Sequence, residues 1–257
     1  MKSSSFLHRA ALAALPATLL FAACSKSDTP APAPAVDQGK ILVSHAAAAA
    51  NTQLTAFAND QQLGQLNYGQ STGYVAVNAG VPMIRINNGT QVASTQALTV
   101  AKAQNYSAFI YSPSATIGST ALLTVADDLS APTSGAKVRL VYLAAGAATP
   151  VRLTIPAPTT TGTDTDLTSD VAFGTASAFA QVNAGPLNLK IVNVTTGPPP
   201  TNTVVRTQVL AVGDGSGGGT GTKNFEAGKI YTIVVRGLAG AGVPTAQQPQ
   251  AVIIQNN

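Results

Sequence analysis

Short apolar runs, many rich in β-branched residues and some alternating with polar residues, recur from residue 40 to the C-terminus. At 83–86 (MIRI) the alternation predicts a strand with one buried and one solvent-facing side. The runs at 230–236 (IYTIVVR) and 251–254 (AVII) are rich in β-branched side chains, which strands favour. The alanines at 46–50 have helix propensity, but so short a run does not nucleate a helix alone, so we interpret it as a loop. The pattern predicts an all-β chain.

Two polar segments are typical of β-hairpin turns. Residues 87–90 (NNGT) contain Asn-Gly, a pair that readily adopts the positive φ angles of a type I′ turn. The second segment, Asn59-Asp60, lies between the apolar stretches 54–58 and 63–66. Both segments are therefore expected to connect antiparallel neighbours.

Three pairs of similar segments occur in the same order along the chain. They are 40–45 (KILVSH) with 137–142 (KVRLVY), 68–86 (YGQSTGYVAVNAGVPMIRI) with 173–191 (FGTASAFAQVNAGPLNLKI), and 101–106 (AKAQNY) with 226–231 (EAGKIY). Two copies in order predict two tandem domains, at 40–132 and 136–257. Each copy is near the length of an immunoglobulin-like sandwich, about 100 residues.

The second copy is longer because of insertions within 156–166 and 197–224. Both insertions are rich in Thr, Pro and Gly and are expected to be largely loops. We therefore predict two tandem immunoglobulin-like antiparallel β-sandwich domains, preceded by a signal peptide and a Pro/Ala-rich linker.

Residues 1–23 have the features of a secretory signal, with Lys2 and Arg9 before an apolar stretch and small residues at its end. The following LFAAC sequence, at 20–24, resembles a lipobox, the motif at which bacterial lipoproteins are diacylated on cysteine and cleaved. Cys24, the only cysteine, is therefore the predicted lipidation site. The alternatives are an ordinary signal peptide and an uncleaved membrane helix, which would need about 20 apolar residues.

The segment 24–39 is predicted to be an acylated cysteine and an extended tether, because alternating Pro and Ala disfavour both helix and sheet. Ser25 after the cysteine favours the outer membrane by analogy with other lipoproteins, and leaves the periplasmic or surface face open. Removing residues 1–23 takes away Lys2 and Arg9 from 14 basic residues, leaving 12 against 10 acidic ones. The basic residues are scattered, which argues against a nucleic-acid partner.

Two tyrosines and four glycines are predicted to have structural roles. Tyr106 and Tyr231 each enter a strand just after a corner, as in the tyrosine corner of β-sandwiches, where the hydroxyl bonds to upstream backbone. The glycines are expected at turns or bulges where a Cβ would clash; they are Gly69, Gly80, Gly174 and Gly185.

These landmarks resemble a bacterial family of unknown function numbered 4397. The first copy carries His45-Ala46, Tyr68-Gly69, Gly73-Tyr74, VNAG at 77–80, Tyr106 and DDL at 127–129 followed by Pro132. The second carries Phe173-Gly174, VNAG at 182–185 and AGKIYT at 227–232, but has Tyr142-Leu143 in place of His-Ala. The resemblance implies exported, often lipidated, tandem immunoglobulin-like domains, and it implies no reaction.

Other motifs carry little chemistry. Residues 213–218 (GDGSGG) fit G-x-G-x-x-G, but no helix is expected to follow, so we interpret them as a loop. Asp164, Asp166 and Asp170 supply oxygen ligands of the kind calcium prefers, without the glycine turn and terminal Glu of an EF-hand, so solvated acids are expected and calcium stays an alternative. Nothing in the sequence predicts a cofactor or a metal site.

A Ser-His-Asp hydrolase would have to use His45, the only histidine after the signal peptide, and no G-x-S-x-G motif supports one. An acid–base glycosidase pair would have to come from the aspartates and Glu226, and nothing in the sequence arranges them. The absence of tryptophan weakens a carbohydrate site, although Tyr68, Tyr74 and Tyr111 could serve as platforms. We therefore predict a non-catalytic binding, adhesion or scaffolding lipoprotein whose loops contact an envelope protein or glycan. The alternatives are a carbohydrate- or matrix-binding surface lipoprotein and an extracytoplasmic hydrolase.

Overall fold

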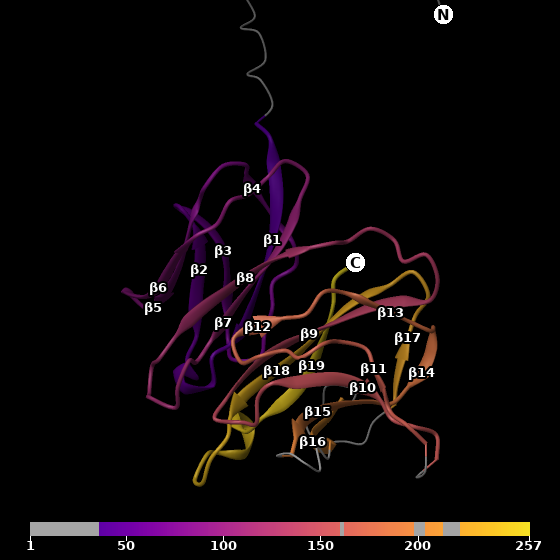
Figure 1. Cartoon of the computed structure of the whole chain (residues 1–257). Coiled ribbons are helices and arrows are strands. Elements are labelled where there is room, and N and C mark those ends of the chain that lie inside the picture. Colours follow the sequence, from indigo (N-terminus) through magenta and orange to yellow (C-terminus); the bar gives the residue numbers. More distant parts are fainter. Residues whose placement is uncertain (1–35, 160–161, 198–203, 213–221) are drawn as a thin grey trace, which may run out of the picture. The chain divides into compact units, whose positions relative to one another are not determined.

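The computed structural model describes residues 36–159, 162–197, 204–212 and 222–257, which belong to one compact unit (Figure 1). The predicted signal peptide, Cys24 and most of the tether lie outside this part of the chain, as do 213–218 and parts of both insertions. We refer to 36–132 as the first half and to 133–257 as the second half. The domain boundaries at 40–132 and 136–257 stay a prediction.

Two four-stranded sheets build the first half. One has the order β4-β1-β7-β8 and the other the order β3-β2-β5-β6. Their strands are β1 (Gln38–Ala46), β2 (Leu54–Ala58), β3 (Gln61–Leu66), β4 (Val75–Asn78), β5 (Met83–Asn88), β6 (Gln91–Ala97), β7 (Asn105–Tyr111) and β8 (Ala121–Asp127). The alanine run, expected to be a loop, contains one turn of 3₁₀ helix, η1 (Ala48–Ala50).

The second half contains the sheets β12-β9-β18-β19, with β13 also on β9, and β11-β10-β15-β16, together with the pair β14-β17. Its longer strands are β9 (Ala136–Ala145), β10 (Val151–Ile155), β15 (Leu189–Thr196), β16 (Val204–Val212), β18 (Ile230–Leu238) and β19 (Gln250–Gln255). The short ones are β11 (Thr165–Asp166), β12 (Thr175–Ala176), β13 (Ala180–Val182), β14 (Gly185–Leu187) and β17 (Lys223–Phe225), and a 3₁₀ turn, η2, spans Thr245–Gln247. No helix among the described residues has the length and apolar character needed to cross a membrane.

The all-β prediction is confirmed, and the structure adds one parallel pairing in each half. β1 runs parallel to β7, and β9 runs parallel to β18, whereas the other ladders are antiparallel. A short-range alternation pattern does not reveal strand direction, because buried parallel and antiparallel strands both read as apolar runs.

The segments that read alike in the two copies pair in the same register. Ile41 lies opposite Tyr106 in the first half, and Val138, the residue aligned with Ile41, lies opposite Tyr231 in the second. The antiparallel ladder on the other side of each strand also agrees, since Ile41 faces Val75 and Val138 faces Ala180. The sequence alignment therefore gives a residue-by-residue correspondence between the two halves.

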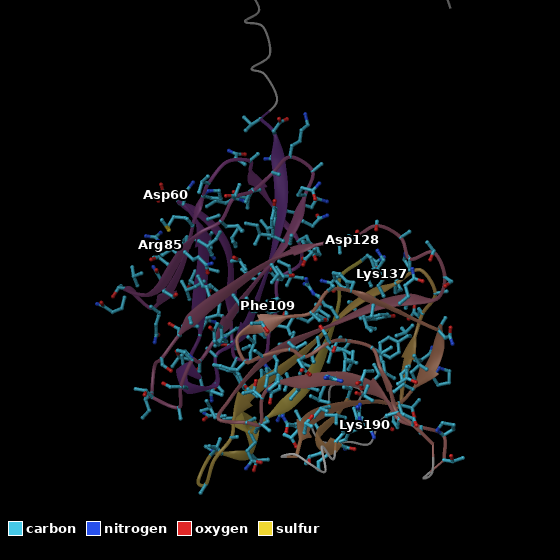
Figure 2. All side chains as sticks on the ribbon, viewed as in Figure 1. Asp60, Arg85, Phe109, Asp128, Lys137 and Lys190 are labelled. Carbon is cyan, nitrogen blue, oxygen red and sulfur yellow. The ribbon has the colours of Figure 1, made fainter. Side chains whose placement is uncertain are left out.

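Four layers of sheet enclose three larger apolar clusters, and a small fourth one contains Ala48, Ala145 and Leu238. One cluster fills the first half between its two sheets, around Leu54, Ile84 and Ile110. Another fills the second half around Tyr142, Ile191 and Ile233. The third lies between the two halves and includes Phe109, Val141 and Val234 from β7, β9 and β18 (Figures 1 and 2). The central strands are therefore covered on both faces, which is why they read as nearly continuous apolar runs.

Both predicted hairpins form, but one turn differs from the prediction. Asn59-Asp60 connects β2 to β3 as expected. In the other, Asn88 pairs with Gln91, so the connecting residues are Gly89 and Thr90, and only Gly89 has a positive φ, +57°. The type I′ prediction is wrong, because that turn needs positive φ at both central residues, whereas a glycine in the first of them is typical of type II′.

Candidate functional site between the two halves

A buried ion pair joins the two halves. Asp127 ends β8, and Arg139 lies on β9 between the core residues Val138 and Leu140, so its side chain leaves the opposite face of the strand. Arg139 Nη2 lies 2.6 Å from Asp127 Oδ1, and the two side chains are 2% and 0% exposed. Removing either charge would leave the other buried and uncompensated, which is costly at a position closed to solvent.

Uncharged polar side chains complete a hydrogen-bond network around this pair. Ser107 Oγ and the Tyr74 hydroxyl donate to Asp127 Oδ2 at 2.7 and 2.6 Å. The guanidinium Nε donates to Thr232 Oγ1 at 2.9 Å, and Thr232 Oγ1 donates to Asn256 Oδ1 at 2.8 Å. Asn256 Nδ2 closes the network by donating to the Tyr74 hydroxyl at 3.0 Å. Burial and the neighbouring carboxylate raise the pKa of Tyr74, which keeps its hydroxyl a donor.

A second cation, which is partly buried, lies at the same contact. The Arg236 guanidinium, on β18, lies over the Tyr68 ring of the first half, 4.4 Å from its centroid. Burial lowers the pKa of Arg236, and its Nε and Nη1 atoms, like the Tyr68 hydroxyl, are buried without a hydrogen-bond partner. Gly69 has a φ of +94°, and a Cβ there would overlap the Arg236 guanidinium. Here the expected clash is present, and it comes from the other half.

The corresponding position of the second half makes the reciprocal contact. Phe173 packs edge-on against Tyr111 of the first half, with 5.7 Å between ring centroids. A Cβ on Gly174 would lie 3.2 Å from the Tyr111 hydroxyl. Each aromatic-glycine pair that the repeats share therefore receives a β7 or β18 side chain from the other half.

The other two predicted glycines have a different physical role. Gly80 and Gly185 have φ angles of +133° and +111°, and a Cβ at either position meets no atom within 4 Å. The clash expected from the sequence is therefore wrong for these two positions. Their backbone conformation, which residues with a side chain rarely adopt, accounts for glycine.

The two predicted corner tyrosines occupy equivalent places. The Tyr106 hydroxyl accepts a hydrogen bond from the Ala101 N–H at 3.1 Å, and the Tyr231 hydroxyl accepts one from the Glu226 N–H at 3.2 Å. Each hydroxyl thus binds backbone five residues upstream, at the start of the corner. These tyrosines hold the loops that precede β7 and β18.

His45 is enclosed in backbone, which contradicts its use as a catalytic base. Its side chain is 0% exposed, Nδ1 accepts from the Ala47 N–H at 3.2 Å, and Nε2 lies 3.0 Å from the Thr52 carbonyl oxygen. This pairing requires the neutral ring with its proton on Nε2. Burial, assisted by the Arg236 charge, lowers the pKa of His45.

Tyr142 performs the same task in the second half. It stands where His45 stands in the first, and its hydroxyl donates to the Ala148 carbonyl at 2.7 Å. Burial raises its pKa to about 12, so the hydroxyl remains a donor. Where the first half has His45, the second half has Tyr142. Each ring donates a hydrogen bond to a carbonyl of the loop that follows its strand.

The loop acids considered for calcium are held by basic side chains. A hydrogen bond at the strand–loop boundary connects each aspartate to a cation: Asp164 to Lys190 at 2.7 Å, Asp166 to Arg152 at 3.0 Å and to Arg206, and Asp170 to Arg152 at 2.6 Å. Burial disfavours ionised Asp166, but its hydrogen bonds to Arg206 and Arg152 outweigh burial and hold the pKa at about 2. Among the residues described, no cluster of three or more metal-ligating side chains occurs.

Beside these acids, residues 156–159 and 162–164 line a hollow of about 560 Å³ together with Lys190 and Arg206. Lys190 is labelled at this side of the second half in Figure 2. The surface combines prolines, threonines and paired charges, which suits contact with a neutral polar partner. The described residues that line it include no unpaired acid and base at a spacing suited to proton transfer.

The sequence analysis missed the residues that connect the halves. Arg139 and Arg236 each interrupt an apolar strand, and a charge inside a run buried on both faces signals a specific partner. Asp127 entered the sequence analysis only as part of the DDL segment at 127–129. Tyr68, Tyr74 and Tyr111, considered as sugar platforms or packing residues, contact the other half of the protein.

The fold and this contact define an all-β protein whose two halves share their strand pairing. Residues 39–153 match the model of the family described as domain of unknown function DUF4397, which confirms the resemblance for that segment. No curated protein matches the chain. A crystal structure of a candidate cell adhesion protein from Bacteroides eggerthii is similar at 11% identity, covering 86% of this chain and 96% of that chain, with a TM-score of 0.28.

Proposed function

We propose that this protein is a non-catalytic binding module of the bacterial cell envelope, anchored through acylated Cys24. The tether to residue 39 would hold the two β-halves away from the bilayer, and the ligand-binding surface would lie on the loops of the second half. The outer membrane is the proposed location, and the partner is an envelope protein or glycan. The module acts by rigid presentation of its loops and performs no reaction.

The observation that carries this proposal is that these titratable side chains bind other groups of the protein. The acids beside the hollow are paired with Arg152, Lys190 and Arg206, and Asp127 is paired with Arg139 inside the protein. His45 binds backbone with both ring nitrogens. These groups bind other parts of the framework, which leaves recognition to the loops, where binding residues are commonly found.

The anchor is tested in producing cells by comparing wild type with Cys24→Ala. Wild type is expected to sediment with membranes and to incorporate labelled palmitate, and Cys24→Ala to do neither. Membrane association and palmitate uptake that persist in Cys24→Ala would refute the anchor. Protease treatment of intact cells then separates the two faces, since cleavage without lysis indicates the cell surface and protection until the outer membrane is opened indicates the periplasm.

Binding is tested with the unacylated mature Cys24→Ala protein, added to intact cells, outer-membrane vesicles and peptidoglycan sacculi. Saturable co-sedimentation with one of these is expected. Thr159→Trp, which fills the hollow, is expected to abolish it, whereas Gln91→Trp, at the exposed start of β6 in the first half, should not. Equal binding by the two variants would remove the hollow from the proposal, and hydrolysis of an esterase, protease or glycosidase substrate would overturn the non-catalytic assignment.

A further inference from the structure

We infer that the two halves associate as an internal pseudo-dimer, and that one buried charge pair restricts this contact to a first half with a second half. The partner recognised by the β1-β7-β8 face of the first half is therefore the β9-β18-β19 face of a second half. Another first half of a second copy is excluded. This inference concerns recognition between parts of the chain and is independent of the proposed ligand.

Equivalent ladders establish which residues correspond. Tyr106 faces Ala126 as Tyr231 faces Gln255, so the next residues, Asp127 and Asn256, are equivalent. The register of β1 on β7 and of β9 on β18 makes Leu42 the counterpart of Arg139. The irregularity after Ile86 on β5 also recurs after Ile191 on β15.

The contacts across the interface are reciprocal, which is the mark of a two-fold arrangement. Tyr68-Gly69 of the first half receives Arg236, and the equivalent Phe173-Gly174 of the second half receives Tyr111. Tyr111 and Arg236 occupy corresponding positions, six residues after Asn105 and six after Ile230. A two-fold contact of this kind can also form between identical halves, unless some residue prevents it.

The contacts of Tyr111 and Arg236 with the aromatic-glycine pairs do not prevent two identical halves from pairing. Either an aromatic ring or a guanidinium packs favourably against an aromatic ring. Tyr111 would therefore be accepted by Tyr68 of another first half, and Arg236 by Phe173 of another second half. Discrimination must come from the centre of the interface.

At the centre, the equivalent positions differ in charge. Ser107 donates a hydrogen bond to Asp127, and the equivalent Thr232 donates one to Asn256. Asp127 is an acid, whereas its counterpart Asn256 is a neutral amide. Two first halves would bury two Asp127 carboxylates against Leu42, and two second halves would bury two Arg139 guanidiniums against Asn256. An uncompensated buried charge disfavours such complexes by on the order of a hundredfold or more.

The outer polar contact at the joint does not supply this selectivity. Lys137 Nζ lies 2.8 Å from Asp128, next to the connection between the halves, and both groups are visible there in Figure 2. The Asp128 side chain is 63% exposed, so water compensates the carboxylate when the pair is separated; the Lys137 side chain is 11% exposed, so this pair discriminates less than the fully buried one. The Asp127–Arg139 pair is the discriminating element.

The test uses the whole folded chain with a site for a sequence-specific protease inserted between Pro132 and Thr133. After cleavage, the halves are separated in urea, allowed to re-pair by dilution, and identified by native mass spectrometry, which distinguishes the three pairings by mass. Wild type is expected to give mixed pairs, with like pairs at about 1% or less. Wild-type halves that fail to re-pair, or that form like pairs freely, would overturn the inference.

The matched variant, Asp127→Asn with Arg139→Leu, gives each position the residue found at its counterpart. It is expected to form all three pairings, and mixed pairs alone would overturn the inference. Because this variant could fail to fold, the exchanged variant Asp127→Arg with Arg139→Asp provides a second measurement. Mixed with wild-type halves, the exchanged halves should re-pair only with each other. Hybrids of a wild-type half with an exchanged half, which would bury two carboxylates or two guanidiniums together, would also overturn the inference.

Discussion

Acidification from pH 7.5 to 5.5 is expected to destabilise the folded chain through His45. The neutral ring fills a site closed by the Ala47 N–H and the Thr52 carbonyl, and a charged ring would lose the acceptor at Nδ1. Burial, with the Arg236 charge nearby, lowers the pKa of His45 from its usual value of 6.5. Tyr68, which packs edge-on at 5.9 Å, is a phenol whose pKa burial raises, so it does not titrate in this range.

The sign and size of the effect follow from proton binding. Below pH 6.5 the unfolded chain binds a proton at His45 that the folded chain does not, so the free energy of unfolding falls as the pH falls. The slope approaches about 1.4 kcal/mol per pH unit and persists until the folded pKa is reached. Stability is therefore fully present above pH 6.5. Asp128 and Asp166, with pKa values of about 2, add no pH dependence to the free energy of unfolding in this window.

Urea unfolding of the mature Cys24→Ala protein at half-unit steps from pH 5.5 to 7.5 measures the slope. His45→Gln is the control, because an amide can donate to Thr52 and accept from Ala47 without titrating. The wild-type midpoint is expected to decrease below pH 6.5 while the His45→Gln midpoint stays level. Parallel profiles for the two proteins would refute the assignment of the pH dependence to His45.

Three further changes test single contacts. Gly80→Val should lower the free energy of unfolding by about 1–3 kcal/mol in urea through its positive φ alone. Gly69→Ala should cost more than Gly80→Ala, because the added Cβ meets Arg236. Equal losses for the two alanine variants would contradict this contact. Tyr231→Phe should cost about 1 kcal/mol by losing the hydrogen bond from the Glu226 N–H, and an unchanged midpoint would show that this bond is dispensable. Millimolar calcium should leave the thermal midpoint unchanged, because the loop carboxylates are paired with cations, and a rise of several degrees would contradict that pairing.

Much of each half could be predicted because its information is local. The alternation at 83–86 and the apolar runs at 230–236 and 251–254 coincide with β5, β18 and β19. The alignment of 68–86 with 173–191 predicted equivalent positions, which pair in equivalent registers. The prediction for the turn at 87–90 was displaced by one residue. It placed Asn88-Gly89 at the centre of the loop, whereas the strand register places Gly89-Thr90 there.

The contact between the halves could not be predicted in detail, because its partners are selected by folding and not by proximity in sequence. Tyr74 and Asn256 are hydrogen-bonded although 182 positions separate them. Tyr74 lies in a segment rich in small and aromatic residues, and no neighbouring residue indicates that its hydroxyl binds a carboxylate. The steric role of Gly69 was predicted, but the group it accommodates, Arg236, belongs to the other half.

One signal in the sequence did point to this contact. A strand in a two-layer sandwich has one wet face and should alternate, whereas β1 and β9 are apolar at both odd and even positions and buried on both faces. Since the strand that opens each copy has this property, each copy needs a cover for its second face, and the other copy offers an equivalent face of the same kind. Mutual burial of the two opening strands therefore follows from the pattern, and Arg139, a charge within the apolar run of one of them, marks where the cover must supply an acid.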